Sequence, residues 1–164
     1  MIDYVRITEE RMKILRGNKK VLEKLEKFAD CKIRINEEVE IETDNPIDIL
    51  RIKQVIQAFG RGFDFETALN LLDEEYLFET IEVKDYSGKS RDRQMVLKGR
   101  VIGTGGKTKT LIEKYAETKI AIYGKTICII GKWDRVELAR KAIDMLLSGS
   151  LHNTVYRFLE KHKR

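Results

Sequence analysis

The residues best suited to chemistry in this chain are three closely spaced glycines followed by lysines. They are Gly103, Gly105 and Gly106, and Lys107 and Lys109 come directly after them. Glycine has no Cβ, so the backbone can turn sharply here and a ligand can approach it closely. A helix that starts just past the turn points its free N–H groups and the positive end of its dipole toward the glycines. Together with the lysine charges, this arrangement favours the binding of a phosphate group.

Two other interpretations use the same residues. Gly106-Lys107-Thr108 matches the end of a nucleotide-binding P-loop, which needs a first glycine at position 101 and a buried strand before it. Position 101 is Val101, and residues 91–100 have the pattern of a charged helix, so the sequence disfavours a P-loop. The second alternative is a plain glycine turn between two helices. Because Gly-x-x-Gly alone is a weak motif, the elements around it must decide.

Those elements follow a simple order along the second half of the chain. Residues 77–85 read as a strand and residues 91–100 as a helix, and residues 108–117 carry apolar side chains on one helical face. Residues 119–123 and 126–130 alternate as two short strands, joined at Gly124-Lys125 and stopped by Gly131. The order is strand, helix, glycine loop, helix, strand, strand, helix.

The last helix of this series has its own start and stop signals. Asp134 with Glu137 three residues later predicts a capping box, and Trp133 is placed to pack on Leu138 as a hydrophobic staple. Gly149 follows the apolar stripe and ends the helix. The order resembles that of a type I KH domain, whose Gly-x-x-Gly loop clamps short single-stranded RNA by its backbone.

The first half of the chain repeats the same order of elements at an offset of 87 residues. Ile33 and Ile35 align with Ile120 and Ile122, and Gly62 aligns with Gly149. We therefore predict an α+β protein of two tandem type I KH domains, residues 1–76 and 77–164. Each has a three-stranded sheet covered on one face by three helices.

The two copies differ at the loop. At the same offset Gly103 becomes Arg16 and Gly106 becomes Lys19, so a phosphate backbone could not approach the first loop as closely. Arg16, Lys19 and Lys20 retain positive charge for a peripheral phosphate contact. Residues 1–83 carry 13 Lys and Arg against 19 Asp and Glu, and residues 84–164 carry 19 against 8. The half with the intact loop is thus the half that attracts polyanions.

Other features narrow the class of protein. The two cysteines, Cys31 and Cys128, lie far apart in sequence and form no zinc motif, so we expect buried reduced thiols. No clustered His, Cys and acidic residues indicate an enzyme, and we expect no cofactor and no metal. No apolar run is long enough to span a bilayer and no signal-peptide pattern follows Met1. We therefore expect a cytoplasmic protein without membrane contact.

Three segments together resemble one family. They are the linker GRGFDFETALNLL, the loop KGRVIGTGGKTK and the late segment LHNTVYRFLEKHKR. They are similar to Partner of Nob, or Dim-two, a small-ribosomal-subunit assembly factor, in its short archaeal form. The resemblance implies an RNA-binding role near the 3′ end of small-subunit rRNA, carried by the second KH domain. It also implies three partners: the Nob endonuclease, the dimethyltransferase of the rRNA 3′ region and the initiation factor two alpha subunit.

The candidate site follows from the loop and its neighbours. We expect backbone contacts from the loop, charge from the basic residues, and an apolar floor with polar edge contacts from the adjoining helix and strands. The full set is Lys98, Arg100, Val101, Ile102, Gly103, Thr104, Gly105, Gly106, Lys107, Thr108, Lys109, Leu111, Ile120, Ile122 and Lys125. Two alternatives stay open: a protein-docking adaptor that uses the acidic first copy, and a generic KH protein with another RNA target.

Overall fold

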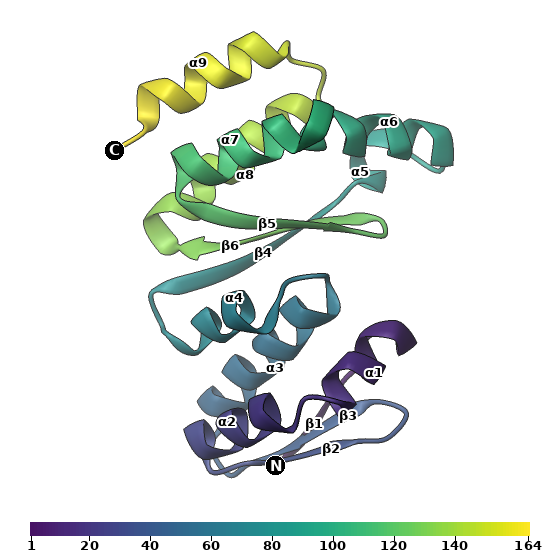
Figure 1. Ribbon diagram of the computed structural model, residues 1–164, viewed down its shortest axis with the longest axis vertical. Coiled ribbons are helices and arrows are strands. Elements are labelled where there is room, and N and C mark those ends of the chain that lie inside the picture. The colour runs from purple at the N-terminus through teal and green to yellow at the C-terminus, as the bar shows by residue number, and fades with distance from the viewer. The chain divides into compact units, whose positions relative to one another are not determined.

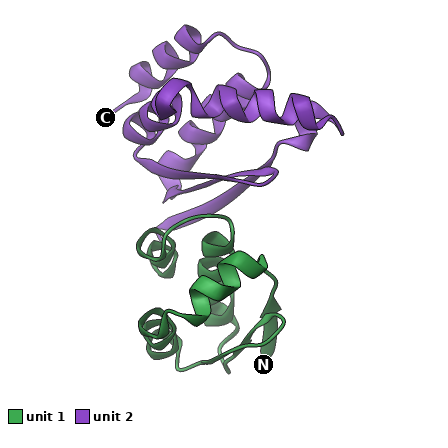
Figure 2. Ribbon diagram, turned by 45° about the vertical axis from the view of Figure 1, so that its right-hand side comes forward, with its two compact units in different colours: residues 1–74 green, residues 75–164 purple.

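The computed structural model describes residues 1–164 and divides them into two compact units, residues 1–74 and 75–164 (Figure 2). Each unit contains one three-stranded antiparallel sheet with helices on one of its faces (Figure 1). The strand orders are β1-β3-β2 and β4-β6-β5, so the last strand of each unit lies in the middle of its sheet. This is the mixed helix and sheet architecture that the sequence predicts.

The first unit begins with a strand and two helices. Its elements are β1 (Ile2–Val5), α1 (Glu9–Arg16), α2 (Lys19–Ala29), β2 (Lys32–Ile35), β3 (Val39–Glu42), α3 (Pro46–Gly60), α4 (Phe65–Leu69) and a 3₁₀ turn (Asn70–Leu72). Side chains cap two of its helices: Thr8 accepts a hydrogen bond from the Arg11 N–H, and Asn45 accepts from the Ile47 N–H. Such caps satisfy N–H groups that the first helical turn leaves without a partner.

The second unit repeats that order and has an extra short helix, α5, directly after its first strand. Its elements are β4 (Tyr76–Glu82), α5 (Lys84–Ser87), α6 (Arg91–Ile102), a 3₁₀ turn (Thr104–Gly106), α7 (Lys107–Ala116), β5 (Thr118–Tyr123), β6 (Thr126–Lys132), α8 (Trp133–Leu147) and α9 (His152–His162). The prediction from the sequence that the first strand of this unit runs to Asp85 is wrong. The strand ends at Glu82 because the chain turns at once into α5, where Asp85 lies.

Backbone conformation confirms the repeat independently of residue type. Only Asp30 and Glu117 among non-glycine residues have positive φ, at 47° and 54°, and they are 87 positions apart. Asp30 directly follows α2 and Glu117 directly follows α7, and each ends its helix in the left-handed region. Gly62 and Gly149 are also 87 positions apart, with φ of 101° and 102°. The two units therefore share turns as well as strand order.

The core of the second unit lies between its sheet and the helices α6, α7 and α8 (Figure 1). Fully buried side chains come from every layer, among them Val101, Ile112, Ile129 and Ile143. Helix α9 packs against α7 and α8 and buries Val155 and Leu159. The glycine loop is thereby fixed between two helices that the core holds in place.

Two predictions at the start of α8 were wrong. The chain continues in β6 through Gly131, which pairs with Leu77 and Thr118, and Lys132 leads directly into the helix. No residue is left between strand and helix to act as a side-chain cap, and Asp134 instead pairs with Arg164. Trp133 is 66% exposed and makes no staple. Gly131 suits the strand because a Cβ there would meet Thr118 Cγ2 at 2.6 Å.

Candidate nucleic-acid interface

The glycine loop forms a tight connection between α6 and α7. Gly103 ends α6 with φ 75° and ψ 170°, and its N–H donates to the Gly99 carbonyl at 2.8 Å. Gly105 and Gly106 follow with φ of 63° and 79°, and α7 starts at Lys107. These backbone angles lie in regions that residues with a Cβ rarely adopt. The predicted turn with a helix starting directly after it is confirmed.

The three glycines have different surroundings. A Cβ on Gly103 would lie 2.3 Å from Thr108 Oγ1 and 2.7 Å from the Thr108 backbone nitrogen, so α7 packs directly on this residue. A Cβ on Gly105 or Gly106 would meet no atom within 4 Å, so both residues face open space. Gly103 therefore serves the packing of the loop. Gly105 and Gly106 leave backbone exposed where a ligand can reach it.

The basic residues around the loop do not all share one role. Lys107 is exposed, and its Nζ lies 5.9 Å from the centre of the Tyr156 ring. The side chain of Lys98 donates to the Gly124 carbonyl at 2.8 Å and so bridges α6 to the hairpin between β5 and β6. Arg100 is engaged elsewhere, because its Nε donates to the Leu146 carbonyl at 2.9 Å and its Nη2 to the Ser150 carbonyl. It holds the connection between α8 and α9.

The apolar residues of the predicted floor divide into two groups. Val101 and Ile120 are buried in the core, with 0% and 4% of their surface exposed. Ile102, Leu111 and Ile122 are partly or largely accessible. Only this second group offers surface to a base. The rest of the predicted set lies as follows: Thr104 is exposed, Lys109 half-buried, Thr108 buried against the Tyr156 hydroxyl at 2.8 Å, and Lys125 exposed in the hairpin.

Strand β5 lies at an edge of its sheet, beside α7, the second helix of the loop. The Ile120 N–H points away from β6 and donates to Glu113 Oε2 on α7, at 3.0 Å. Antiparallel pairing alternates along a strand, so the same outward direction applies to the backbone of Ile122. Sequence reasoning missed Glu113. The repeat could have revealed it, because Glu26 lies 87 positions earlier and accepts from the Ile33 N–H at 3.4 Å.

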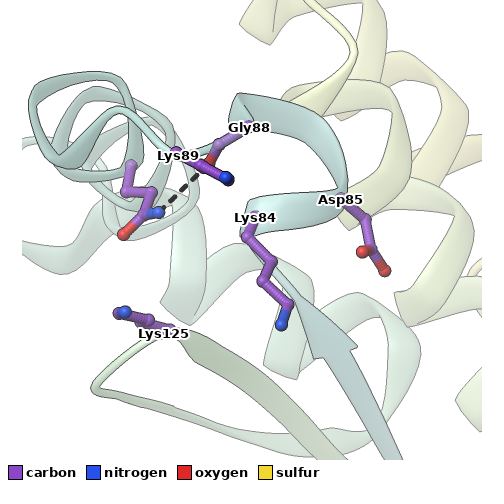
Figure 3. A pocket seen from close by; sticks show the side chains of 6 residues that line it. Lys84, Asp85, Gly88, Lys89 and Lys125 are labelled. Atoms are coloured by element: carbon purple, nitrogen blue, oxygen red, sulfur yellow. Dashed lines mark hydrogen bonds between the residues drawn. The ribbon is translucent and has the colours of Figure 1, made fainter.

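A hollow of about 310 Å³ lies where the hairpin approaches the start of α6 (Figure 3). Lys84, Lys89 and Lys125 line it together with Asp85, and the Gln94 side chain donates to the Gly88 carbonyl at its rim. Three lysines beside one carboxylate give the hollow positive charge. The sequence indicated only Lys125, because Lys84 and Lys89 come near it through the α5 turn that was read as a strand.

A second hollow, of about 510 Å³, lies on the α9 side of the loop. Gly99, Gly103 and Lys107 line it from the α6–α7 side, and His152 and Tyr156 line it from α9. The His152 Nε2 lies 3.0 Å from the Arg100 carbonyl oxygen, which fixes the start of α9 beside α6. Neither α9 residue belonged to the predicted site.

The charge of the second unit supports an anionic ligand. Residues 75–164 carry 19 Lys and Arg against 11 Asp and Glu, whereas residues 1–74 carry 13 against 16. The described chain contains no group of three or more His, Cys, Asp and Glu placed to hold a metal ion. None of its helices combines the length and the apolar character needed to cross a membrane.

The corresponding loop of the first unit has a different backbone and different contacts. Gly17 has an ordinary φ of −78°, and Asn18 accepts from the Val21 N–H to start α2. The Arg16 side chain reaches Glu9 at 3.4 Å and the Asn36 carbonyl at 2.8 Å. No residue of this loop provides the open, left-handed backbone that Gly105 and Gly106 provide in the second unit.

Comparison with known proteins agrees with this geometry. Residues 77–164 match the model of the eukaryotic-type KH domain, KH-domain type I, in the form of the second KH domain of PNO1. The chain belongs to the PNO1 family. A KH domain-containing protein of Methanocaldococcus jannaschii is 34% identical over 170 residues, which cover 99% of this chain and 74% of that protein.

Two further PNO1-family relatives carry informative names. The pre-rRNA-processing protein pno1 of Schizosaccharomyces pombe is 34% identical over 116 residues, 70% of this chain and 48% of that protein. This chain thus spans about half the length of that relative. The Dim2p structure solved in a complex with initiation factor 2 alpha and rRNA from Pyrococcus horikoshii has a TM-score of 0.86 and 34% identity. That match covers 98% of this chain and 93% of the solved one.

Proposed function

We propose that this protein is an RNA-binding ribosome assembly factor whose second KH domain, residues 77–164, binds single-stranded RNA near the 3′ end of small-subunit rRNA. The observation that carries the proposal is the open backbone at Gly105 and Gly106, placed at the start of α7 beside Lys107. A phosphodiester can lie against these residues, since no Cβ keeps it away. KH loops of this type clamp about four nucleotides.

The remaining parts of the site have complementary roles in this proposal. Ile102, Leu111 and Ile122 supply accessible apolar surface for bases, and Lys98 with the lysines of the hairpin hollow supplies charge. Binding acts through position and charge without chemistry on the RNA, so the protein is not an enzyme. Membership of the PNO1 family and the rRNA in the related Pyrococcus complex support small-subunit rRNA as the ligand. A factor with this role acts in the cytoplasm.

The test is the double variant Gly105→Asp with Gly106→Asp. It adds two negative charges where the phosphates would lie, at roughly 1 kcal/mol or more for each close charge pair. We expect RNA affinity to fall about 30-fold or more, since 1.4 kcal/mol corresponds to a factor of ten. Fluorescence anisotropy with rRNA 3′-end oligonucleotides measures this.

The matched control is Lys141→Glu, which changes net charge by the same amount at an exposed position of α8. Its affinity should remain close to that of the wild type. Circular dichroism should show both variants folded, since Gly105 and Gly106 have open space around them. Equal affinity of the double variant and the wild type would remove the loop from the proposal.

The second candidate function is that of a protein-docking adaptor, in which the first KH domain, residues 1–76, holds partner proteins. The absence of a left-handed glycine backbone in the first loop and the excess of acidic residues in that unit favour it. The expected partners are the initiation factor two alpha subunit, the Nob endonuclease and the rRNA dimethyltransferase. The double aspartate variant discriminates between the functions: capture of the alpha subunit by this RNA-deficient protein supports an adaptor, and loss of capture argues against it.

A further inference from the structure

The hollow on the α9 side of the loop has a composition unlike that of a simple anion site. Two basic side chains border it, but the Arg100 guanidinium is already bound to the carbonyls of Leu146 and Ser150. Lys107 is therefore the one cation there that makes no hydrogen bond to protein, and its Nζ lies over the Tyr156 ring. One lysine beside aromatic and apolar surface suits a group that carries a charge and a flat ring together.

Helix α6 also leaves room in this hollow. Gly99 lies in the interior of the helix, where glycine is less stable than alanine. A Cβ at this position would meet no atom within 4 Å, so packing against the protein does not require glycine. Gly99 and the exposed Val96 form the α6 wall of the hollow, and Tyr156 lines it from α9. Because Gly99 has no side chain, a planar ligand can approach α6 closely at this position.

Tyr156 is held in a defined position. Its hydroxyl lies 2.8 Å from Thr108 Oγ1, and the His152 ring approaches it edge-on with 6.1 Å between ring centres. A ring whose orientation is fixed loses little freedom when a second ring stacks on it. The Lys107 ammonium, at 5.9 Å from that ring, can exchange this weak contact for a phosphate.

We propose that this hollow receives the base of a flanking nucleotide, one that lies just outside the four-nucleotide stretch clamped by the loop. The base stacks on Tyr156 against the Gly99 wall, and Lys107 holds the adjoining phosphate. Gly103 and Lys107 belong both to the loop and to this hollow, so a strand that leaves the loop reaches it without a break. This inference rests on the proposed RNA binding and extends its footprint around the loop toward α9.

The test uses six-nucleotide random-sequence RNA pools in three forms: all nucleotides intact, the two 5′ nucleotides abasic, or the two 3′ nucleotides abasic. All forms carry the same phosphates, so a difference in affinity reports the bases. For the wild-type protein we expect the abasic change at one end to weaken binding by about fivefold or more, the lower range for a stacked base. The change at the other end should have a smaller effect.

Three variants locate that effect. Gly99→Leu fills the hollow while favouring the helix, Tyr156→Leu removes the ring, and Tyr156→Phe keeps the ring without its hydroxyl. The quantity compared is the affinity for the intact pool divided by the affinity for the abasic pool at the sensitive end. For Gly99→Leu and Tyr156→Leu this ratio should be at least about fivefold smaller than for the wild type. Tyr156→Phe keeps the ring but loses the hydroxyl contact with Thr108, so this ratio should fall less than it does for Tyr156→Leu. A six-nucleotide RNA can bind the four-nucleotide clamp in more than one register, which raises its apparent affinity. This increase is the same for all the proteins and cancels when their ratios are compared.

The possible results separate the two proposals. Equal ratios for wild type and Gly99→Leu would overturn the flanking-base site while leaving RNA binding by the loop intact. A wild-type protein that binds none of the pools would overturn the proposed function itself. Weakened binding of Gly99→Leu to every pool by one common factor would show that the hollow contributes to the clamp and takes no separate base.

Discussion

The clearest prediction concerns Gly103→Ala, a change that should damage the fold although it lies in a proposed RNA-binding loop. Two independent observations contribute. The backbone of Gly103, with φ 75° and ψ 170°, lies in a region that is almost restricted to glycine. The added Cβ would also lie 2.7 Å from the backbone nitrogen of Thr108 and 2.3 Å from its hydroxyl. The backbone of α7 cannot move away without losing its contacts with the core.

The magnitude follows from these two terms. A side chain in such a backbone conformation costs about 1–3 kcal/mol, and overpacking against a fixed backbone costs about 1–3 kcal/mol more. The sum is about 2–6 kcal/mol of unfolding free energy. For a unit of the size of residues 75–164, each 1 kcal/mol lowers the melting temperature by about 4–8 °C. The variant should therefore melt at least about 8 °C below the wild type.

Differential scanning calorimetry measures the effect, with two comparison variants. Gly105→Ala has a left-handed backbone but no clash, so it should lose only about 1–2 kcal/mol. Gly99→Ala has neither a left-handed backbone nor a clash, and its unfolding free energy should rise by about 0.5–1 kcal/mol from better helix propensity. The expected order of melting temperatures is Gly99→Ala, wild type, Gly105→Ala, Gly103→Ala. A Gly103→Ala protein as stable as Gly105→Ala would refute the packing role assigned to Gly103.

Two other predictions concern buried polar groups. Burial, with a smaller contribution from Glu26, raises the pKa of the Cys31 thiol to about 11. Alkylation by iodoacetamide at pH 8 should therefore be slow until the protein unfolds. Fast labelling of the native protein would contradict this expectation. Because the pKa is raised in the folded state, the thiol contributes stability below its unfolded pKa of 9.0, and this stability is lost as the pH rises through about 11. The buried Arg135 donates to the carbonyls of Tyr115 and Ala116 at 2.6 and 3.3 Å, so Arg135→Met should lower unfolding free energy by about 3 kcal/mol in urea, and an unchanged midpoint would exclude this clamp.

The sequence was sufficient for those parts of the fold that depend on local pattern. Helix faces, the glycine loop and the offset between the copies all follow from residue type and spacing, and the structure confirms them. Contacts that the chain makes over a long distance were not predictable in this way. Asp134 looked like a cap until Arg164, thirty residues later, supplied its partner. Lys84 and Lys89 joined the hairpin hollow only because β4 stops at Glu82.

The candidate site shows the same division. The loop residues were identifiable because glycine and lysine have strong local preferences. The roles of their neighbours depend on which atoms they meet, so Arg100 was assigned to the ligand although it binds Leu146 and Ser150. Tyr156 lies on the last helix, far from the loop in sequence, and no spacing rule connects the two. Glu113 was recoverable only by comparing the two copies and asking what they retain besides the core.

That comparison also bears on how each unit protects the border of its sheet. Each unit has an open sheet, and an unprotected border strand can recruit a strand from another molecule and start aggregation. In both units a glutamate from the neighbouring helix, Glu26 or Glu113, already occupies an outward N–H of the border strand, at Ile33 or Ile120. A carboxylate at this place repels an incoming backbone carbonyl. The first unit has this guard although its loop lacks the glycines, so protection of the strand border does not depend on the RNA-binding loop.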